Sequence, residues 1–284
     1  MNLKRLSEIP TWEWPKGSDK LLGIVLRDRH AKASDRLMAA ELAGDYGVIN
    51  DELAGILLSI VQSGDESEEM RSTAAIAFGP ALESADTDEF DEPESVPITE
   101  PMFHRLQEAL RSLYLDTGIP KQVRRRILEA SVRAPADWHQ AAIHGAYDSG
   151  DMEWRLTAVF SMRYVPGGFD EQILEALNSR DPEIHIQAVY AAGAAEVDAA
   201  WEHVISLVTS AKTERRLRIA AISAVAGIRA HEAPEVLDEL AESDDEEIAD
   251  AVEEALLLAG AQDFDEDAAI EEREGEERGT DWIN

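Results

Sequence analysis

The chain has 284 residues, of which 44% are hydrophobic, so it is long enough to bury a sizeable core. It contains no cysteine, which excludes disulfides, zinc–thiolate sites and thiol nucleophiles. No secretory signal opens it and no apolar run could span a bilayer, so we expect a cytoplasmic protein with no membrane partner. Its net charge of −33 opposes the binding of nucleic-acid phosphates.

The first 18 residues are predicted to form an N-terminal cap. Trp12 and Trp14 lie between Pro10 and Pro15, where neither a long helix nor a strand is expected. We predict that the two indoles form an apolar plug over the first repeat.

Seven amphipathic helices are predicted along the rest of the chain, at intervals that suggest a repeat. Apolar residues at positions i, i+3, i+4 and i+7 give each of them one buried face. These first helices are predicted at Leu21–Arg27, Asp51–Val61, Met102–Leu115, Trp138–Tyr147, Glu171–Leu177, Trp201–Val208 and Pro234–Leu240.

A second helix is predicted after each first helix, and it carries a fixed slot that is usually Arg. Small or apolar residues follow three, four and seven positions later, which lets this helix lie close to its neighbour. The slot recurs at Arg36, Arg71, Arg124, Arg155, His185 and Arg218. The last second helix, over 244–260, lacks the Arg. Gly44, Gly79 and Gly193 are predicted to end their helices in the left-handed conformation.

An acidic insertion lengthens the interval between Arg71 and Arg124. Residues 83–100 hold eight acids and neither Lys nor Arg, so we expect a mobile, solubilising loop or a lid over the groove of the repeats. An acidic tail is predicted at 261–284. The predicted organisation is therefore a single repeat domain over 1–260, followed by the tail.

Two stretches resemble the HEAT-like repeat family, in particular the repeats of phycocyanobilin lyases. They run Asp-Glu-Ser-Glu-Glu-Met-Arg-Ser-Thr-Ala-Ala from Asp65 and Asp-Pro-Glu-Ile-His-Ile-Gln-Ala-Val from Asp181. The resemblance extends over roughly residues 20–260. It implies an all-α fold, a right-handed α-solenoid of about seven antiparallel helix pairs of the HEAT or armadillo type.

The slot has two interpretations. In HEAT-like repeats an Asp between the helices commonly pairs with such an Arg, which forms a ladder between neighbouring repeats. Asp65 and Arg71 have the spacing for this pair, whereas the alternative is a row of ligand-binding arginines. We predict a structural ladder of Arg36, Asp65, Arg71, Arg124, Arg155, His185 and Arg218.

Two basic patches are candidates for binding a partner protein. They fall on second helices, which line the concave side in the HEAT-like family, and we expect Arg125 and Arg126 to be exposed. The alternative is an ordinary solvated helix face. The candidate protein-binding residues are Lys121, Arg125, Arg126, Arg215 and Arg216.

No catalytic, cofactor or metal site is predicted. HExxH, GxGxxG, Walker A and GxSxG motifs are missing, and His139 and His144 are five residues apart, the wrong spacing for one helical face. Deoxyhypusine hydroxylases of the HEAT-like family use several His–Glu dyads, and this chain has one, His231-Glu232. The sequence therefore favours a non-catalytic scaffold for another protein. The alternatives are a lyase-type enzyme or assembly factor and, second, a nucleic-acid binder.

Overall fold

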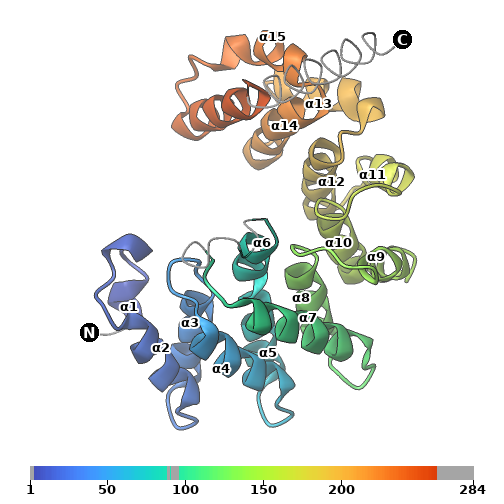
Figure 1. The fold of residues 1–284 in the computed structure, drawn as a ribbon. Helices are drawn as coiled ribbons and strands as arrows, with labels where there is room; N and C mark the ends of the chain where they lie inside the picture. Colours follow the sequence, from blue (N-terminus) through green and yellow to red (C-terminus); the bar gives the residue numbers. More distant parts are fainter. Residues whose placement is uncertain (1–2, 88–89, 91–95, 261–284) are drawn as a thin grey trace, which may run out of the picture. The chain divides into compact units, whose positions relative to one another are not determined.

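The computed structural model describes residues 3–87, 90 and 96–260. These residues form helices and turns, with no strand among them. The chain divides into two compact units, Met1–Ala146 and Tyr147–Asn284. Both consist of consecutive helix pairs, so the predicted all-α class, an α-solenoid of antiparallel pairs, is confirmed (Figure 1). The single domain over 1–260 stays a prediction, and the predicted tail lies outside the described residues.

The first unit has two layers of helices. The first helices α2, α4 and α7 pack side by side, and the second helices α3, α5 and α8 pack against one another in the other layer. The short helix α6 follows α5 and contacts α8. The bounds in this unit are α1 (Leu3–Leu6), η1 (Thr11–Glu13), α2 (Ser18–Arg27), α3 (Ala33–Ala43), α4 (Asp51–Gln62), α5 (Glu68–Ile76), α6 (Gly79–Thr87), α7 (Glu100–Leu115) and α8 (Lys121–Ser131).

The second unit repeats this arrangement. The second helices α10, α12 and α14 pack in sequence, and the first helices α11 and α13 cover them on one side. The helix α9 ends at the boundary between the units. The helix α9 (His139–Tyr147) belongs to the first unit except for its last residue. The bounds in the second unit are α10 (Met152–Ser161), α11 (Asp170–Ala176), α12 (Pro182–Ala194), η2 (Asp198–Ala200), α13 (Trp201–Thr209), α14 (Arg215–Ile228), η3 (Ala230–Glu232), α15 (Ala233–Leu237), η4 (Asp238–Leu240) and a last helix over 246–260.

Polar side chains begin the second helices at the predicted turns. Ser67 Oγ accepts the backbone N–H of Met70 at 3.1 Å, ahead of α5. Asp181 Oδ1 accepts the N–H groups of Glu183 and Ile184 at 3.0 and 3.1 Å, ahead of α12. These bonds satisfy N–H groups that have no partner within the helix, so they fix where each helix begins.

The glycines of the repeat allow close packing between neighbouring second helices. A Cβ on Gly44 would lie 2.6 Å from Ala77 O, and one on Gly193 would lie 2.7 Å from Ala224 Cα. The prediction that these glycines stop their helices in a left-handed conformation is wrong. Gly44 has a φ of −85°, Gly79 opens α6, and Gly193 lies inside α12. These glycines matter because they have no side chain, which lets neighbouring helices pack closely, and not because their backbone is free to adopt a positive φ.

The two tryptophans of the N-terminal cap lie in different environments. Trp14 donates its indole N–H to Leu6 O and Ile9 O, each at 3.1 Å. Trp12 is 84% exposed, so the prediction that it plugs the first repeat is wrong. The two residues are separated by two positions around the 3-10 turn η1, which directs their side chains to different sides.

The acidic insertion begins as a helix and ends anchored to a first helix. Residues 83–87 belong to α6, so the prediction of a loop there is wrong. Val96 and Ile98 are buried, and Thr99 donates its N–H and hydroxyl to the Asp51 carboxylate at 2.9 and 2.7 Å. Residues 88–89 and 91–95 lie outside the described residues. The described end of the insertion therefore docks on α4, in the layer opposite the second helices.

Candidate functional site

Four slot arginines cap the first helix of their own pair. The Nε–H of each arginine points to the carbonyl of the residue ten positions earlier, which is the penultimate residue of the first helix. Carbonyls at a helix C-terminus lack partners within the helix and form the negative end of its dipole, so a guanidinium is well suited to bind them. The pairs and Nε–O distances are Arg36 to Leu26 at 3.3 Å, Arg71 to Val61 at 2.9 Å, Arg124 to Tyr114 at 2.7 Å and Arg218 to Val208 at 2.9 Å.

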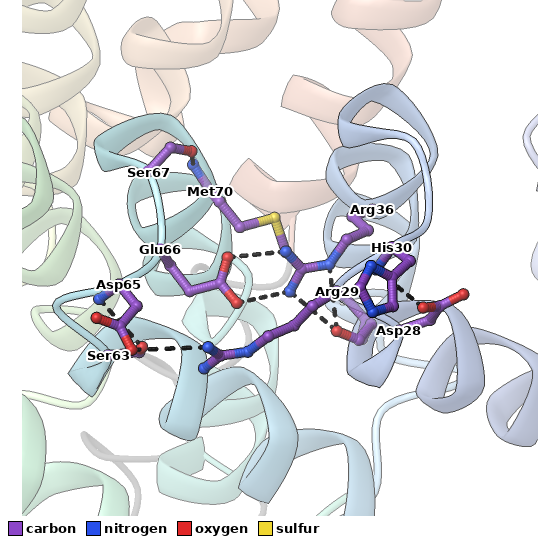
Figure 2. Close-up of polar contacts among 10 residues, drawn as sticks. Asp28, Arg29, His30, Arg36, Ser63, Asp65, Glu66, Ser67 and Met70 are labelled. Atoms are coloured by element: carbon purple, nitrogen blue, oxygen red, sulfur yellow. Dashed lines mark hydrogen bonds and ion pairs between the residues drawn. The ribbon is translucent and has the colours of Figure 1, made fainter.

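Arg36 also connects the first pair to the second. Its Nη1 and Nη2 each lie 2.8 Å from a carboxylate oxygen of Glu66, so the contact is bidentate (Figure 2). Both side chains are nearly buried, with exposed fractions of 11% and 10%. The hydrogen bond from Arg36 holds the pKa of Glu66 below its ordinary value. The ladder between repeats is thus built here by a Glu in the loop before α5.

The predicted Asp65–Arg71 pair is wrong. Asp65 lies instead 3.6 Å from Arg29, and both side chains are well exposed (Figure 2). Arg71 is buried and points to the Val61 carbonyl. The Val61 carbonyl, and not the Asp65 carboxylate, accepts from the Arg71 guanidinium. The carbonyl lies beside the guanidinium in the interior, whereas Asp65 is exposed to water.

The remaining slots use other partners. Arg155 Nη2 bonds to the Tyr147 hydroxyl and to Glu175 Oε1, both at 2.6 Å. Burial and the Glu175 hydrogen bond raise the pKa of Tyr147. His185 Nε2 lies 3.1 Å from His203 Nε2, and burial lowers the pKa of both imidazoles. Both contacts join one helix pair to the first helix of the next.

The predicted basic patch on α8 is largely neutralised. Arg125 is buried, with Gln122 Oε1 at 2.8 Å and Glu129 at 3.8 Å, so the prediction that it is exposed is wrong. Arg126 makes an ion pair with the same Glu129. Lys121 is exposed at the start of α8. Glu129 is itself buried and draws both arginines to one side of the helix.

The patch on α14 is also paired. Arg215 contacts Asp245 and, at 3.3 Å, Glu247. Arg216 binds both carboxylate oxygens of Glu183 on α12, at 2.8 and 3.2 Å. These side chains connect neighbouring helix pairs within the second unit. Their ion pairs neutralise the positive charges that an acidic partner would need.

A groove of about 630 Å³ lies on the second-helix layer of the first unit. It carries three carboxylates against one guanidinium, Arg126. The lining of this groove is therefore acidic overall. Its lining residues are Glu41, Glu68, Glu69, Ser72, Thr73, Ile76, Gln122 and Arg126.

An arginine among aromatic rings occupies the second-helix layer of the second unit. The Arg163 guanidinium carbon lies 4.7 Å from the ring centre of Tyr190, 5.5 Å from Tyr164 and 5.7 Å from Phe160. Phe160 is the penultimate residue of α10. Arg163 and Tyr164 lie three and four residues later in the turn that follows, on the same side of the chain as Phe160. Tyr190 comes from α12. All four side chains are half-buried, and we call them the Arg163 cluster.

The sequence prediction missed this cluster because Arg163 falls outside the period of the slot. Its signal was a Phe three residues before an Arg and a Tyr directly after it, at a helix end. The third ring, Tyr190, is 27 positions further along and becomes visible only when α10 and α12 pack together.

His139 is a core histidine. It is 1% exposed, its Nδ1 accepts the N–H of Ala136 at 2.9 Å, and its Nε2 therefore carries the proton toward Ser131 Oγ at 3.0 Å. Burial lowers its pKa to about 4. Within the described chain no three His, Asp or Glu side chains converge so as to hold a metal ion.

Comparisons with known proteins find solved structures that resemble this chain weakly. No family model matches the chain, and no curated protein matches its sequence. Human deoxyhypusine hydroxylase in complex with glycerol aligns with 15% identity over 88% of this chain and 87% of its own, at a TM-score of 0.40. An engineered protein aligns with 18% identity over 73% and 96%, at 0.42. Escherichia coli YibA aligns with 16% identity over 87% and 83%, at 0.45. Among the described residues, no helix has the length and apolarity to cross a membrane.

Proposed function

We propose that the chain is a non-catalytic scaffold that binds another protein through its second-helix layer. The observation that carries this proposal is the Arg163 cluster, in which Phe160, Tyr164 and Tyr190 surround one guanidinium. Aromatic residues and Arg are enriched at protein interfaces and dominate their binding energy. The side chains already contact one another, and such packing lowers the conformational entropy lost when a partner binds.

The location of the cluster supports the same proposal. Phe160 lies on α10 and Tyr190 on α12, and Arg163 and Tyr164 lie in the turn that follows α10. The cluster therefore belongs to second helices of the second unit. Repeat arrays commonly bind partners along one layer of their helices.

The two other functions predicted from the sequence gain no specific support. Binding of phosphates requires clustered cations that are free to displace counterions. Arg126, Arg215 and Arg216 are instead engaged by carboxylates. A lyase-type activity stays a prediction from the family resemblance, and a cytoplasmic location stays a prediction from composition.

A comparative pull-down from the source cell tests the proposal. The natural chain, Tyr190→Ala and Met152→Ala serve as baits, with thermal unfolding as the check on their folding. Met152 is the matched control because it is 54% exposed at the start of α10 but is not a member of the cluster. We expect a protein that binds the natural chain and the Met152 variant and is lost from the Tyr190 variant. Equal recovery by all three baits would contradict the proposal.

A further inference from the structure

The Arg163 guanidinium lies among three aromatic rings but has no acceptor within the described chain. Three rings lie within 4.7–5.7 Å of it, yet no carboxylate or carbonyl of the described residues accepts from its N–H groups. Five N–H donors lie in the plane of a guanidinium, and aromatic rings stack on its faces. The edge that carries the donors is therefore the part of Arg163 left to bind something else.

Three other arginines that stack on rings within the described residues each have an acceptor. They show what the fold provides when a stacked arginine serves only to hold helices together. The three are Arg124, which donates to Tyr114 O at 2.7 Å, Arg155, which donates to Glu175 at 2.6 Å, and Arg229, which donates to Asp198 at 2.8 Å. Arg163 differs from them in this respect.

The carboxylate on the same face of α12 is already engaged. Glu183 lies seven residues, about two helical turns, before Tyr190. Both of its oxygens accept from Arg216 at 2.8 and 3.2 Å. Arg216 thus engages this acid, and the Arg163 cluster remains a cationic point in a chain of net charge −33.

We propose that Arg163 is the receptor for a carboxylate side chain of the partner protein, an inference that rests on the proposed function. A carboxylate matches the guanidinium edge with two parallel hydrogen bonds. The rings of Tyr190, Tyr164 and Phe160 lie 4.7–5.7 Å from the guanidinium carbon, where they can contact the aliphatic part of the acidic residue. A single negative charge also meets less repulsion from this acidic chain than a phosphate dianion would.

Selection of short random peptides displayed on phage tests the inference, with the full chain as the target. We expect the peptides that bind the natural chain but not Tyr190→Ala to share an Asp or Glu. For one such peptide, changing that acid to its amide should weaken binding to the natural chain roughly tenfold or more. The same change should have little effect on binding to Arg163→Gln. Arg163→Lys, which keeps the charge without the planar edge, should recover only part of the loss.

The carboxylate receptor and the proposed protein-binding function can be refuted separately. If the amide change weakens binding to the natural chain and to Arg163→Gln equally, the carboxylate receptor is refuted while binding at the cluster stands. If no selected peptide depends on Tyr190, the proposed function falls and the inference with it. Tighter binding of a phosphoserine version than of the acidic peptide would overturn the choice of a carboxylate. Thermal unfolding of each variant shows that a loss of binding is not a loss of fold.

Discussion

Arg71 donates its Nε–H to the carbonyl oxygen of Val61 at 2.9 Å, and the two residues are ten positions apart. Val61 is the penultimate residue of α4, and Arg71 lies in the first turn of α5. The same relationship, with the same separation, recurs at three other slots. The bond therefore fixes how the second helix of a pair folds back on the end of the first.

Replacing Arg71 by Ala should lower the free energy of unfolding by about 1–3 kcal/mol, because the buried Val61 carbonyl loses its partner. Urea unfolding measures the change. Arg105→Ala is the control, since Arg105 is an exposed residue of α7 and should shift stability by less than about 0.5 kcal/mol. An unchanged urea midpoint for Arg71→Ala would show that the cap contributes nothing.

Glu66→Ala should cost about 2–4 kcal/mol, because it leaves the nearly buried Arg36 guanidinium without its counterion. The matched control is Glu52→Ala. Glu52 lies 2.7 Å from Arg27, but both side chains are more than half exposed, so this loss should be about 0–1 kcal/mol. Equal losses of stability in the two variants would show that burial does not strengthen the Arg36–Glu66 pair.

The same pair predicts a dependence on acid. The hydrogen bond from Arg36 lowers the pKa of Glu66 in the folded chain, so its stabilisation is full above the unfolded value of about 4.3. It is lost as the pH falls through the folded pKa, where the carboxylate takes up a proton. We expect Glu66→Gln to flatten the stability profile below about pH 4.3, measured by urea unfolding across pH. A slope identical to that of the natural chain would argue against this assignment.

His139 should make the fold less stable at mildly acidic pH. Its folded pKa is about 4, whereas an unfolded His titrates near about 6.5. Between these values the unfolded chain binds a proton that the folded chain does not, so stability falls by about 3 kcal/mol as the pH drops from about 6.5 to 4. His139→Gln should remove this part of the slope and leave the part from His185 and His203, whose pKa values burial also lowers. The exposed His30→Gln should keep the whole slope. Persistence of the full slope in His139→Gln would place its origin elsewhere.

Two glycines should respond to Ala in opposite directions. Gly193→Ala places a methyl group 2.7 Å from Ala224 Cα, so we expect a loss of about 1–3 kcal/mol from overpacking. Gly55 lies inside α4 with no atom within 4 Å of the added Cβ, so Gly55→Ala should gain about 0.5–1 kcal/mol. Differential scanning calorimetry compares the two. A stabilised Gly193→Ala would mean that α12 and α14 are not in close contact.

The helix pairs could be predicted from the sequence because their signal is periodic. Each amphipathic first helix and each slot is repeated, so a weak match at one position, such as His185, is supported by the others. The position of the arginines was predictable for the same reason. Their acceptor was not, because a backbone carbonyl has no residue type that marks it, and Asp65 offered a plausible carboxylate in its place.

The candidate site could not be predicted because it depends on contacts between distant residues. Arg125 reads as exposed on its own helix, yet the buried Glu129 four residues later holds it inside. Arg163 gains its significance from Tyr190, which lies on another helix. The sequence shows the charge of a side chain but not its neighbours. The role of that side chain depends on which partners the packing of distant residues brings next to it.

The arginine cap also makes much of each helix pair a local unit of the chain. Its two partners are ten residues apart, and closing such a short loop takes about 10–100 ns. The cap can therefore form without any residue of the next pair. Among the four capping arginines, Arg36 also binds Glu66, thirty residues later, so it ties the first pair to the second as well as capping its own.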